Sequence, residues 1–182
     1  ETQVIPLASE ALASNEAEMR SGAATALGIL KSPGAVDALI AALRDMSEDV
    51  RQSAATALGQ IGDPRAVPAM LDLLREDQHH MTRYYVVQAL QAFHQPQVVD
   101  AVCWVMQTAT DSWTRDSAAQ TLGNLQDPRA IPILVATISD DRSNAGLYSA
   151  IALTKLGKPG VDQLLQLLGN ADKRVSRNAI SA

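Results

Sequence analysis

The residues best suited to catalysis or metal binding gather in one part of the chain. The histidines His79, His80 and His94 and the single cysteine, Cys103, all lie between positions 79 and 103. Cys103 would act as a nucleophile with His94 only as a thiolate in a polar, accessible setting. The adjacent side chains of His79 and His80 diverge on a helix, and no third ligand is spaced to join them. We therefore predict no catalytic residue, no metal site and no cofactor.

Composition narrows the functional classes further. The sequence contains no Gly-rich phosphate loop, no H-E-x-x-H and no G-x-S-x-G. A net charge of -5 disfavours nucleic-acid binding, which normally requires a basic face. No uncharged apolar run approaches the roughly 18 residues of a membrane-spanning helix. One cysteine cannot form an internal disulfide, so we expect a cytoplasmic protein. From its charge and the lack of a long apolar run, we expect that it neither binds nucleic acid nor inserts into a membrane.

Aromatic residues are concentrated in the same region. Every aromatic residue except Tyr148 lies between positions 84 and 113. Alignment of the repeated segments described below places Trp104 at a position that is small or polar in other copies, namely Ala41, Asp72 and Ala136. Such a position faces outward on a helix, so we expect Trp104 to be exposed.

Exposed tryptophan and tyrosine side chains are typical anchors of protein interfaces. In the same alignment Tyr84, Tyr85 and Trp113 also replace polar residues of the other copies. The predicted binding residues are Trp104, Tyr84, Tyr85, Trp113, Gln107 and His80. The alternative is that this bulkier segment only repacks locally around larger side chains.

These side chains sit within a regular repeat. Leucine recurs at positions 27, 58, 90, 122 and 153, and proline recurs at 33, 64, 96, 128 and 159. Both series advance by 31, 32, 32 and 31 residues. Periods of about 20 to 50 residues are typical of solenoids. We therefore predict an all-α, right-handed α-solenoid of stacked helical hairpins with a 31–32 residue repeat.

One repeat predicts two helices joined by a tight turn. Apolar residues from Val50 to Ile61 recur at intervals of three and four, as they do on one face of a helix. Gly62 suits the exit from this helix, Asp63 suits the cap of the next, and Pro64 suits its first position. The small alanines of the first helix allow neighbouring helices to approach closely, and stacked hairpins bury what one hairpin cannot.

The same pattern sets the expected boundaries. We expect one domain over residues 1–182, because no linker or low-complexity segment interrupts the repeats. A half repeat at 1–15 precedes repeats at 16–46, 47–78, 79–110, 111–142 and 143–171, and a partial repeat follows at 172–182. Both ends interrupt the pattern, so we expect the chain to be a fragment of a longer protein.

The string ALGQIGDPRAVPAMLDLLRED at residues 57–77, preceded by R-x-x-A-A at 51–55, resembles the short HEAT-like repeat of the phycobilin lyase family. The resemblance covers essentially the whole chain and implies that the second helix of each hairpin lines a concave face. Such repeats serve many unrelated binding roles, so the resemblance implies a fold and does not specify one function. The His–Glu pairs that a likeness to metal-binding HEAT-like hydroxylases would require are absent.

An arginine recurs near the start of successive first helices, at Arg20, Arg51, Arg83 and Arg115. One hypothesis is a stripe that binds anions. The resemblance implies instead that each arginine pairs with a nearby acid and fixes the stacking, a role that suits bidentate guanidinium–carboxylate bonds. The candidate acids are Asp45, Asp49, Asp77 and Asp111.

The sequence thus favours a non-catalytic scaffold that binds another protein on the concave face of an α-solenoid. The alternative, which the resemblance permits, is a phycobilin lyase or isomerase subunit or a related factor acting on phycobiliproteins. In that case the chain would be an enzyme of the phycobilin lyase type, and its partner would be a phycobiliprotein.

Overall fold

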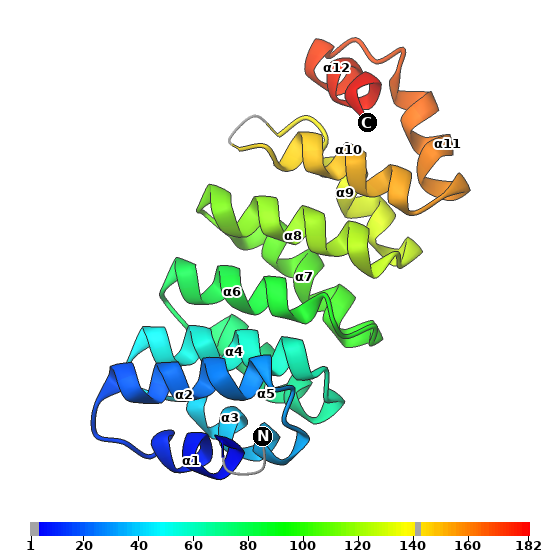
Figure 1. Ribbon diagram of the computed structural model, residues 1–182. Coiled ribbons are helices and arrows are strands. Elements are labelled where there is room, and N and C mark those ends of the chain that lie inside the picture. The colour runs from blue at the N-terminus through cyan, green and yellow to red at the C-terminus, as the bar shows by residue number, and fades with distance from the viewer. Residues whose placement is uncertain (1–3, 141–142) are drawn as a thin grey trace. The chain divides into compact units, whose positions relative to one another are not determined.

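A computed structural model describes residues 4–140 and 143–182, and every regular element within these ranges is helical (Figure 1). The all-α prediction is therefore confirmed. The first three residues of the expected half repeat, and residues 141–142 at the end of the expected repeat 111–142, lie outside the described residues. No helix in the described ranges is long and apolar enough to cross a membrane.

The chain divides into two compact units, Glu1–Phe93 and His94–Ala182. Their boundary falls inside the expected repeat 79–110, between its two helices. The single domain and the repeat boundaries therefore stay predictions, and each unit is described by itself.

Glu1–Phe93 is built from stacked hairpins. The helices α2, α4 and α6 pack side by side, and α1, α3 and α5 each pack on the helix that follows in sequence. We call α2, α4 and α6 the first-helix layer of this unit. The bounds are α1 Val4–Ala11, α2 Ala17–Ile29, α3 Val36–Ala42, α4 Glu48–Ile61, α5 Val67–Glu76 and α6 His80–Leu90, with 3-10 turns at Pro33–Ala35 and Pro64–Ala66.

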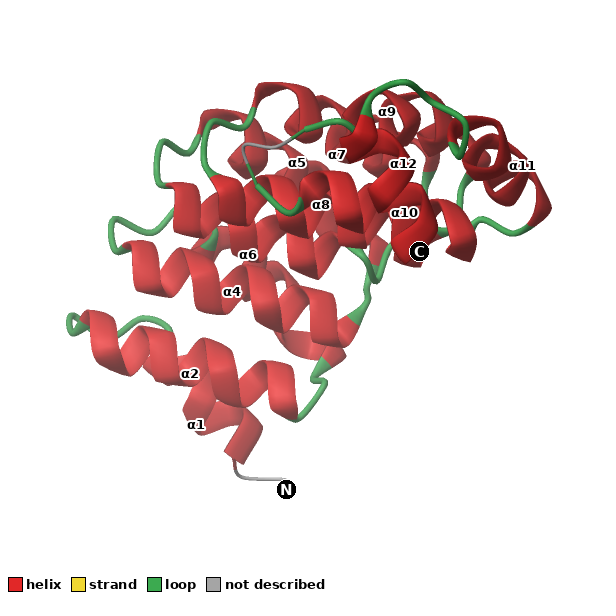
Figure 2. Cartoon of the chain, turned by 90° about the horizontal axis from the view of Figure 1, so that it is seen from above, coloured by secondary structure: helices red, strands yellow, loops and turns green. Residues whose placement is uncertain are grey.

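His94–Ala182 repeats this arrangement. Here α8, α10 and α12 form the first-helix layer, and α7, α9 and α11 pack on α8, α10 and α12 respectively. Figure 2 shows α7 and α9 on one side of α8 and α10. The bounds are α7 Pro96–Thr108, α8 Ser112–Leu125, α9 Ile131–Thr137, α10 Ala145–Lys155, α11 Lys158–Leu167 and α12 Lys173–Ser181, with a 3-10 turn at Pro128–Ala130.

The predicted apolar faces form the cores of these stacks. On α4 the side chains of Val50, Ala54 and Leu58 are fully buried, and on α5 so are Val67 and Leu74. Complete burial of a leucine or valine contributes about 1.5–3 kcal/mol. Hydrophobic contact between hairpins therefore holds each unit together.

The turn between α4 and α5 has the predicted residues in their predicted roles, but the second helix starts later than predicted. Gly62 ends α4 in the left-handed conformation, with φ of 74°, and Asp63 Oδ1 accepts a hydrogen bond from Arg65 N at 2.9 Å. Pro64 opens a 3-10 turn, closed by a bond from Ala66 N to Asp63 O at 3.1 Å. The second α-helix consequently begins at Val67, three residues later than the predicted start.

Glycines on the first helices set how closely these helices pack. A Cβ atom at Gly28 of α2 would lie 2.6 Å from the Cα of Ala57 on α4, and one at Gly59 would lie 2.9 Å from the Cα of Ala89 on α6. Real Cβ atoms are essentially never found at such distances. Backbone contact between α2 and α4, and between α4 and α6, therefore depends on glycine.

Candidate functional site

Trp104 and Gln107 form an exposed stripe on α7 in the second unit. The two residues are three apart and so lie on one face of the helix. Trp104 keeps 39% of its surface exposed although most large apolar side chains of α7 are buried, and Gln107 is exposed. Thr108 Oγ1 donates a hydrogen bond to the Trp104 carbonyl at 2.9 Å. An aromatic ring and a neighbouring amide are thus both open to a ligand.

An open groove of about 340 Å³ adjoins this stripe between α7 and α9. Its lining includes Gln107 and Met106 from α7 and Ile133 and Ala136 from α9. Ala136 occupies the same place in its repeat as Trp104 does in its own. The small alanine leaves room beside α7 where a second tryptophan would fill it.

Trp113 is the most exposed aromatic residue of the predicted set, with 65% of its surface open. It lies in the first turn of α8, where Asp111 Oδ1 caps the helix by accepting a bond from Thr114 N at 2.7 Å. Trp113 therefore belongs to the first-helix layer, whereas Trp104 and Gln107 belong to α7. These two parts of the predicted set lie on different helices of the stack.

The remaining predicted residues, His80, Tyr84 and Tyr85, lie on α6 in the first unit. The two tyrosine rings meet edge to face, with centroids 5.3 Å apart and planes at 76°. Gln88 Nε2 donates a 2.7 Å hydrogen bond to the Tyr84 hydroxyl, and His80 is exposed at the start of the helix. The structure brings the two tyrosines together, and sequence reasoning had not predicted this contact.

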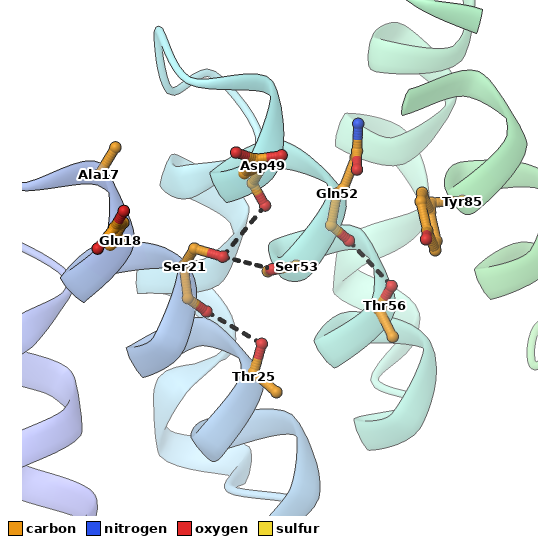
Figure 3. Close-up of a pocket in the computed structure, with 9 residues that line it drawn as sticks. All are labelled: Ala17, Glu18, Ser21, Thr25, Asp49, Gln52, Ser53, Thr56 and Tyr85. Atoms are coloured by element: carbon orange, nitrogen blue, oxygen red, sulfur yellow. Dashed lines mark hydrogen bonds between the residues drawn. The ribbon is translucent and has the colours of Figure 1, made fainter. Parts of the chain in front are cut away.

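A second groove, which sequence reasoning missed, crosses the first-helix layer of Glu1–Phe93. It encloses about 330 Å³ (Figure 3). Hydroxyl, amide and carboxylate groups line it, and Tyr85 closes one end (Figure 3). Its lining residues are Ala17, Glu18, Ser21, Thr25, Asp49, Gln52, Ser53, Thr56 and Tyr85. A recurring threonine, at Thr25 and Thr56, was the available sequence signal.

The arginines of the first unit bond to backbone and carboxylate together. Arg20 donates to both carboxylate oxygens of Asp45, at 2.7 and 2.8 Å, and to the carbonyl of Ser14 at 2.9 Å. Arg51 donates to Asp77 at 2.6 Å and to the Asp45 carbonyl at 2.9 Å. Each guanidinium therefore joins the connection before its helix to the connection that follows its hairpin.

In the second unit Arg115 is 2% exposed and donates to the carbonyl of Ala109 at 3.3 Å, with Asp140 3.8 Å away. Its nearby acid is thus Asp140, and Asp111 acts as a helix cap instead. Within residues 4–140 and 143–182, the Asp49 carboxylate takes part in no ion pair. The repeat that contains Arg83 has Ala109 at the position of Asp77, the acid that pairs with Arg51 in the preceding repeat.

Cys103 is half-buried on α7. Burial raises the pKa of its thiol to about 11, and the nearby Asp100 carboxylate adds to this increase. A thiol with so high a pKa is protonated at neutral pH and is a poor nucleophile. Phe93 is buried, with 3% exposed. Across residues 4–140 and 143–182, His, Cys, Asp and Glu side chains form no group of three placed to hold a metal ion.

HEAT repeats match residues 5–91 and 67–146, and the chain therefore belongs to the HEAT repeat family. The family resemblance predicted from the sequence is confirmed. None of the curated proteins matches the chain.

Solved structures share the fold. A chain of the complex of CpcE and CpcF of phycocyanin lyase from Nostoc sp. PCC7120 is 25% identical, with a TM-score of 0.74; the match covers 97% of this chain and 74% of that one. An engineered protein is 21% identical at a TM-score of 0.65, with 98% and 94% covered. Human deoxyhypusine hydroxylase is 19% identical at a TM-score of 0.50, with 97% and 82% covered. The last two likenesses concern the fold alone.

Proposed function

We propose that this chain is a non-catalytic protein-interaction module and that a protein partner binds it through Trp104 and Trp113. The exposure of these two tryptophans carries the proposal, because buried apolar positions surround Trp104 on its own helix. Tryptophan is strongly enriched among the residues that dominate binding energy. The groove beside Gln107 gives the partner a place to insert a side chain.

The partner we propose is another protein subunit. The matching Nostoc chain comes from a complex of two proteins, CpcE and CpcF, and HEAT repeats offer extended surfaces for such assembly. A cytoplasmic setting, which the single Cys103 suggests, belongs to the same proposal. His80, Tyr84 and Tyr85 are proposed as further contact residues.

Alanine substitution of the tryptophans tests this proposal. We expect Trp104→Ala and Trp113→Ala each to weaken binding to a protein captured from the source lysate by about 30-fold, the effect of losing about 2 kcal/mol. Leu165→Ala, which removes another exposed apolar side chain from the same unit, should leave affinity unchanged. Affinities are measured by titration calorimetry with the purified partner, after circular dichroism shows equal helicity. Equal affinities for all three variants would refute the proposed surface.

A second candidate function is that of a phycobilin lyase subunit or a related factor acting on phycobiliproteins. It is favoured by the 25% identity with the phycocyanin lyase chain over 97% of this chain. We expect the absorbance spectrum of added bilin to shift when the pigment is mixed with the folded chain. We also expect the pigment to remain bound to the chain on desalting. The urea-unfolded chain is the control. Identical spectra with and without the folded chain, together with loss of the pigment on desalting, would reject this candidate.

A further inference from the structure

The groove over α2, α4 and α6 continues into a second hollow. The hollow of about 330 Å³ described above and a neighbouring one of about 280 Å³ share Thr56 and Tyr85 in their linings. The second hollow is lined by glutamines, including Gln60 and Gln88, and by no charged residue. Together the two hollows form one trough within Glu1–Phe93, and Tyr85 stands at its middle.

Negative charge is confined to one end of this trough. Glu18 and Asp49 both line it, and its lining contains no lysine, arginine or histidine. No ion pair within residues 4–140 and 143–182 involves either carboxylate. Each lies in the first turn of its helix, where the helix macrodipole stabilises an ionised carboxylate. Among the described residues, the trough therefore holds two carboxylates that no cationic side chain pairs with.

The nearby arginines do not neutralise these charges. The guanidinium of Arg20 is engaged with Asp45, and that of Arg51 is engaged with Asp77. Both point to the connections between hairpins. Neither of these two arginines therefore supplies a positive charge to Glu18 or Asp49.

The hydroxyls of the trough are arranged as acceptors. Thr25 Oγ1 donates to the Ser21 carbonyl at 3.0 Å, and Thr56 Oγ1 donates to the Gln52 carbonyl at 2.9 Å. Ser21 and Ser53 share one hydrogen bond of 2.9 Å between α2 and α4 (Figure 3). Because the threonine hydrogens are used within the helices, the oxygen lone pairs remain for a ligand that donates.

Tyr85 supplies an aromatic wall. Tyr84 packs edge to face against its ring, and Gln88 holds the Tyr84 hydroxyl. An aromatic ring attracts a cation placed over its face. The trough thus combines two carboxylates, hydroxyl acceptors and a held aromatic ring.

The geometry points to a site that binds the side chain of an arginine carried by an extended segment of a partner protein. A guanidinium has five donors and no acceptor, stacks on aromatic rings and bonds carboxylates in pairs. The uncharged glutamine end matches a peptide backbone, whose N–H and C=O groups need both donors and acceptors. This site lies apart from Trp104 and Trp113 in sequence and goes beyond the function proposed above.

The test is a titration of the intact, ¹⁵N-labelled chain with the peptide acetyl-Gly-Arg-Gly-amide, followed by two-dimensional NMR. We expect saturable shifts of amides in α2, α4 and α6. The same peptide with citrulline, which is neutral and similar in shape, should bind at least about tenfold more weakly, because it lacks the charge that pairs with the carboxylates. Equal binding of the citrulline peptide, or shifts confined to other helices, would overturn the proposal.

Matched variants identify the residues. The double variant Glu18→Gln, Asp49→Asn should bind the arginine peptide about tenfold more weakly, and Tyr85→Leu about threefold more weakly. Glu10→Gln, which removes an exposed carboxylate on α1 outside the trough, should bind as tightly as the unsubstituted chain. Thermal unfolding by circular dichroism shows which variants are folded. An unchanged affinity in the folded double variant would rule out the site, whatever the tryptophan variants show.

Discussion

Gly28→Ala is expected to destabilise the protein by about 1–3 kcal/mol, because the added methyl group enters space that a neighbouring backbone already occupies. The new Cβ atom would lie 2.6 Å from the Cα of Ala57 and 2.8 Å from its Cβ. Neither atom is the end of a flexible side chain, so α2 and α4 must move apart. The same separation would loosen the buried leucines beneath the contact.

Gly22→Ala is the matched control for this prediction. Gly22 lies on the same helix, and nothing stands within 4 Å of a Cβ atom at its position. Alanine is favoured over glycine inside a helix, so this change should stabilise the protein by about 0.5–1 kcal/mol. Urea unfolding followed by circular dichroism compares the two variants. Midpoints that shift in the same direction would contradict a role for Gly28 in helix contact.

Asp77→Asn is expected to lower the free energy of unfolding by about 2–3 kcal/mol, because it leaves the Arg51 guanidinium without its carboxylate. The pair is well shielded, with 13% of the Arg51 side chain and 4% of the Asp77 side chain exposed. Asparagine has nearly the same shape, and its amide oxygen can still accept the 2.8 Å bond that His79 N donates to Asp77. The substitution therefore removes the charge while keeping this hydrogen bond from His79 N.

The control for this second prediction is Asp72→Asn, the same change five positions earlier. Asp72 is about half exposed, and its nearest cation, Arg75, is 3.9 Å away. Exposed ion pairs of this kind contribute between about 0 and 1 kcal/mol. Urea midpoints and hydrogen exchange of the α4 amides measure both variants. If Asp72→Asn proves as damaging as Asp77→Asn, the arginine pair has no special part in stability.

Local features of the fold were predictable because each depends on few neighbouring residues. The spacing of apolar residues predicted the buried face of α4, and Gly62 and Asp63 adopt the predicted turn roles. The outward position of Trp104 followed from Asp72 in the preceding repeat. Cys103 differs from its counterpart in the preceding repeat, since Leu71 is buried whereas the Cys103 side chain is only half-buried.

The candidate sites were less predictable because they depend on how neighbouring helices are rotated. Ser21 aligns with Gln52 in the repeat, yet its hydroxyl bonds to Ser53, one position further on. A shift of one residue between α2 and α4 cannot be read from the period. For the same reason the alignment did not predict that Tyr85 would close a groove.

The arginine bonds also bear on how such a protein gains and loses length during evolution. Arg20 and Asp45 fall in the predicted repeat 16–46, and Arg51 and Asp77 fall in the next predicted repeat, 47–78. The other acceptors of Arg51 are the backbone carbonyls of Asp45 and Met46 in the preceding repeat, and every residue supplies such a group. Duplication of one repeat in the gene would therefore copy the charged pair complete. The contact between the new repeat and its neighbour would therefore form without a compensating substitution in the neighbour.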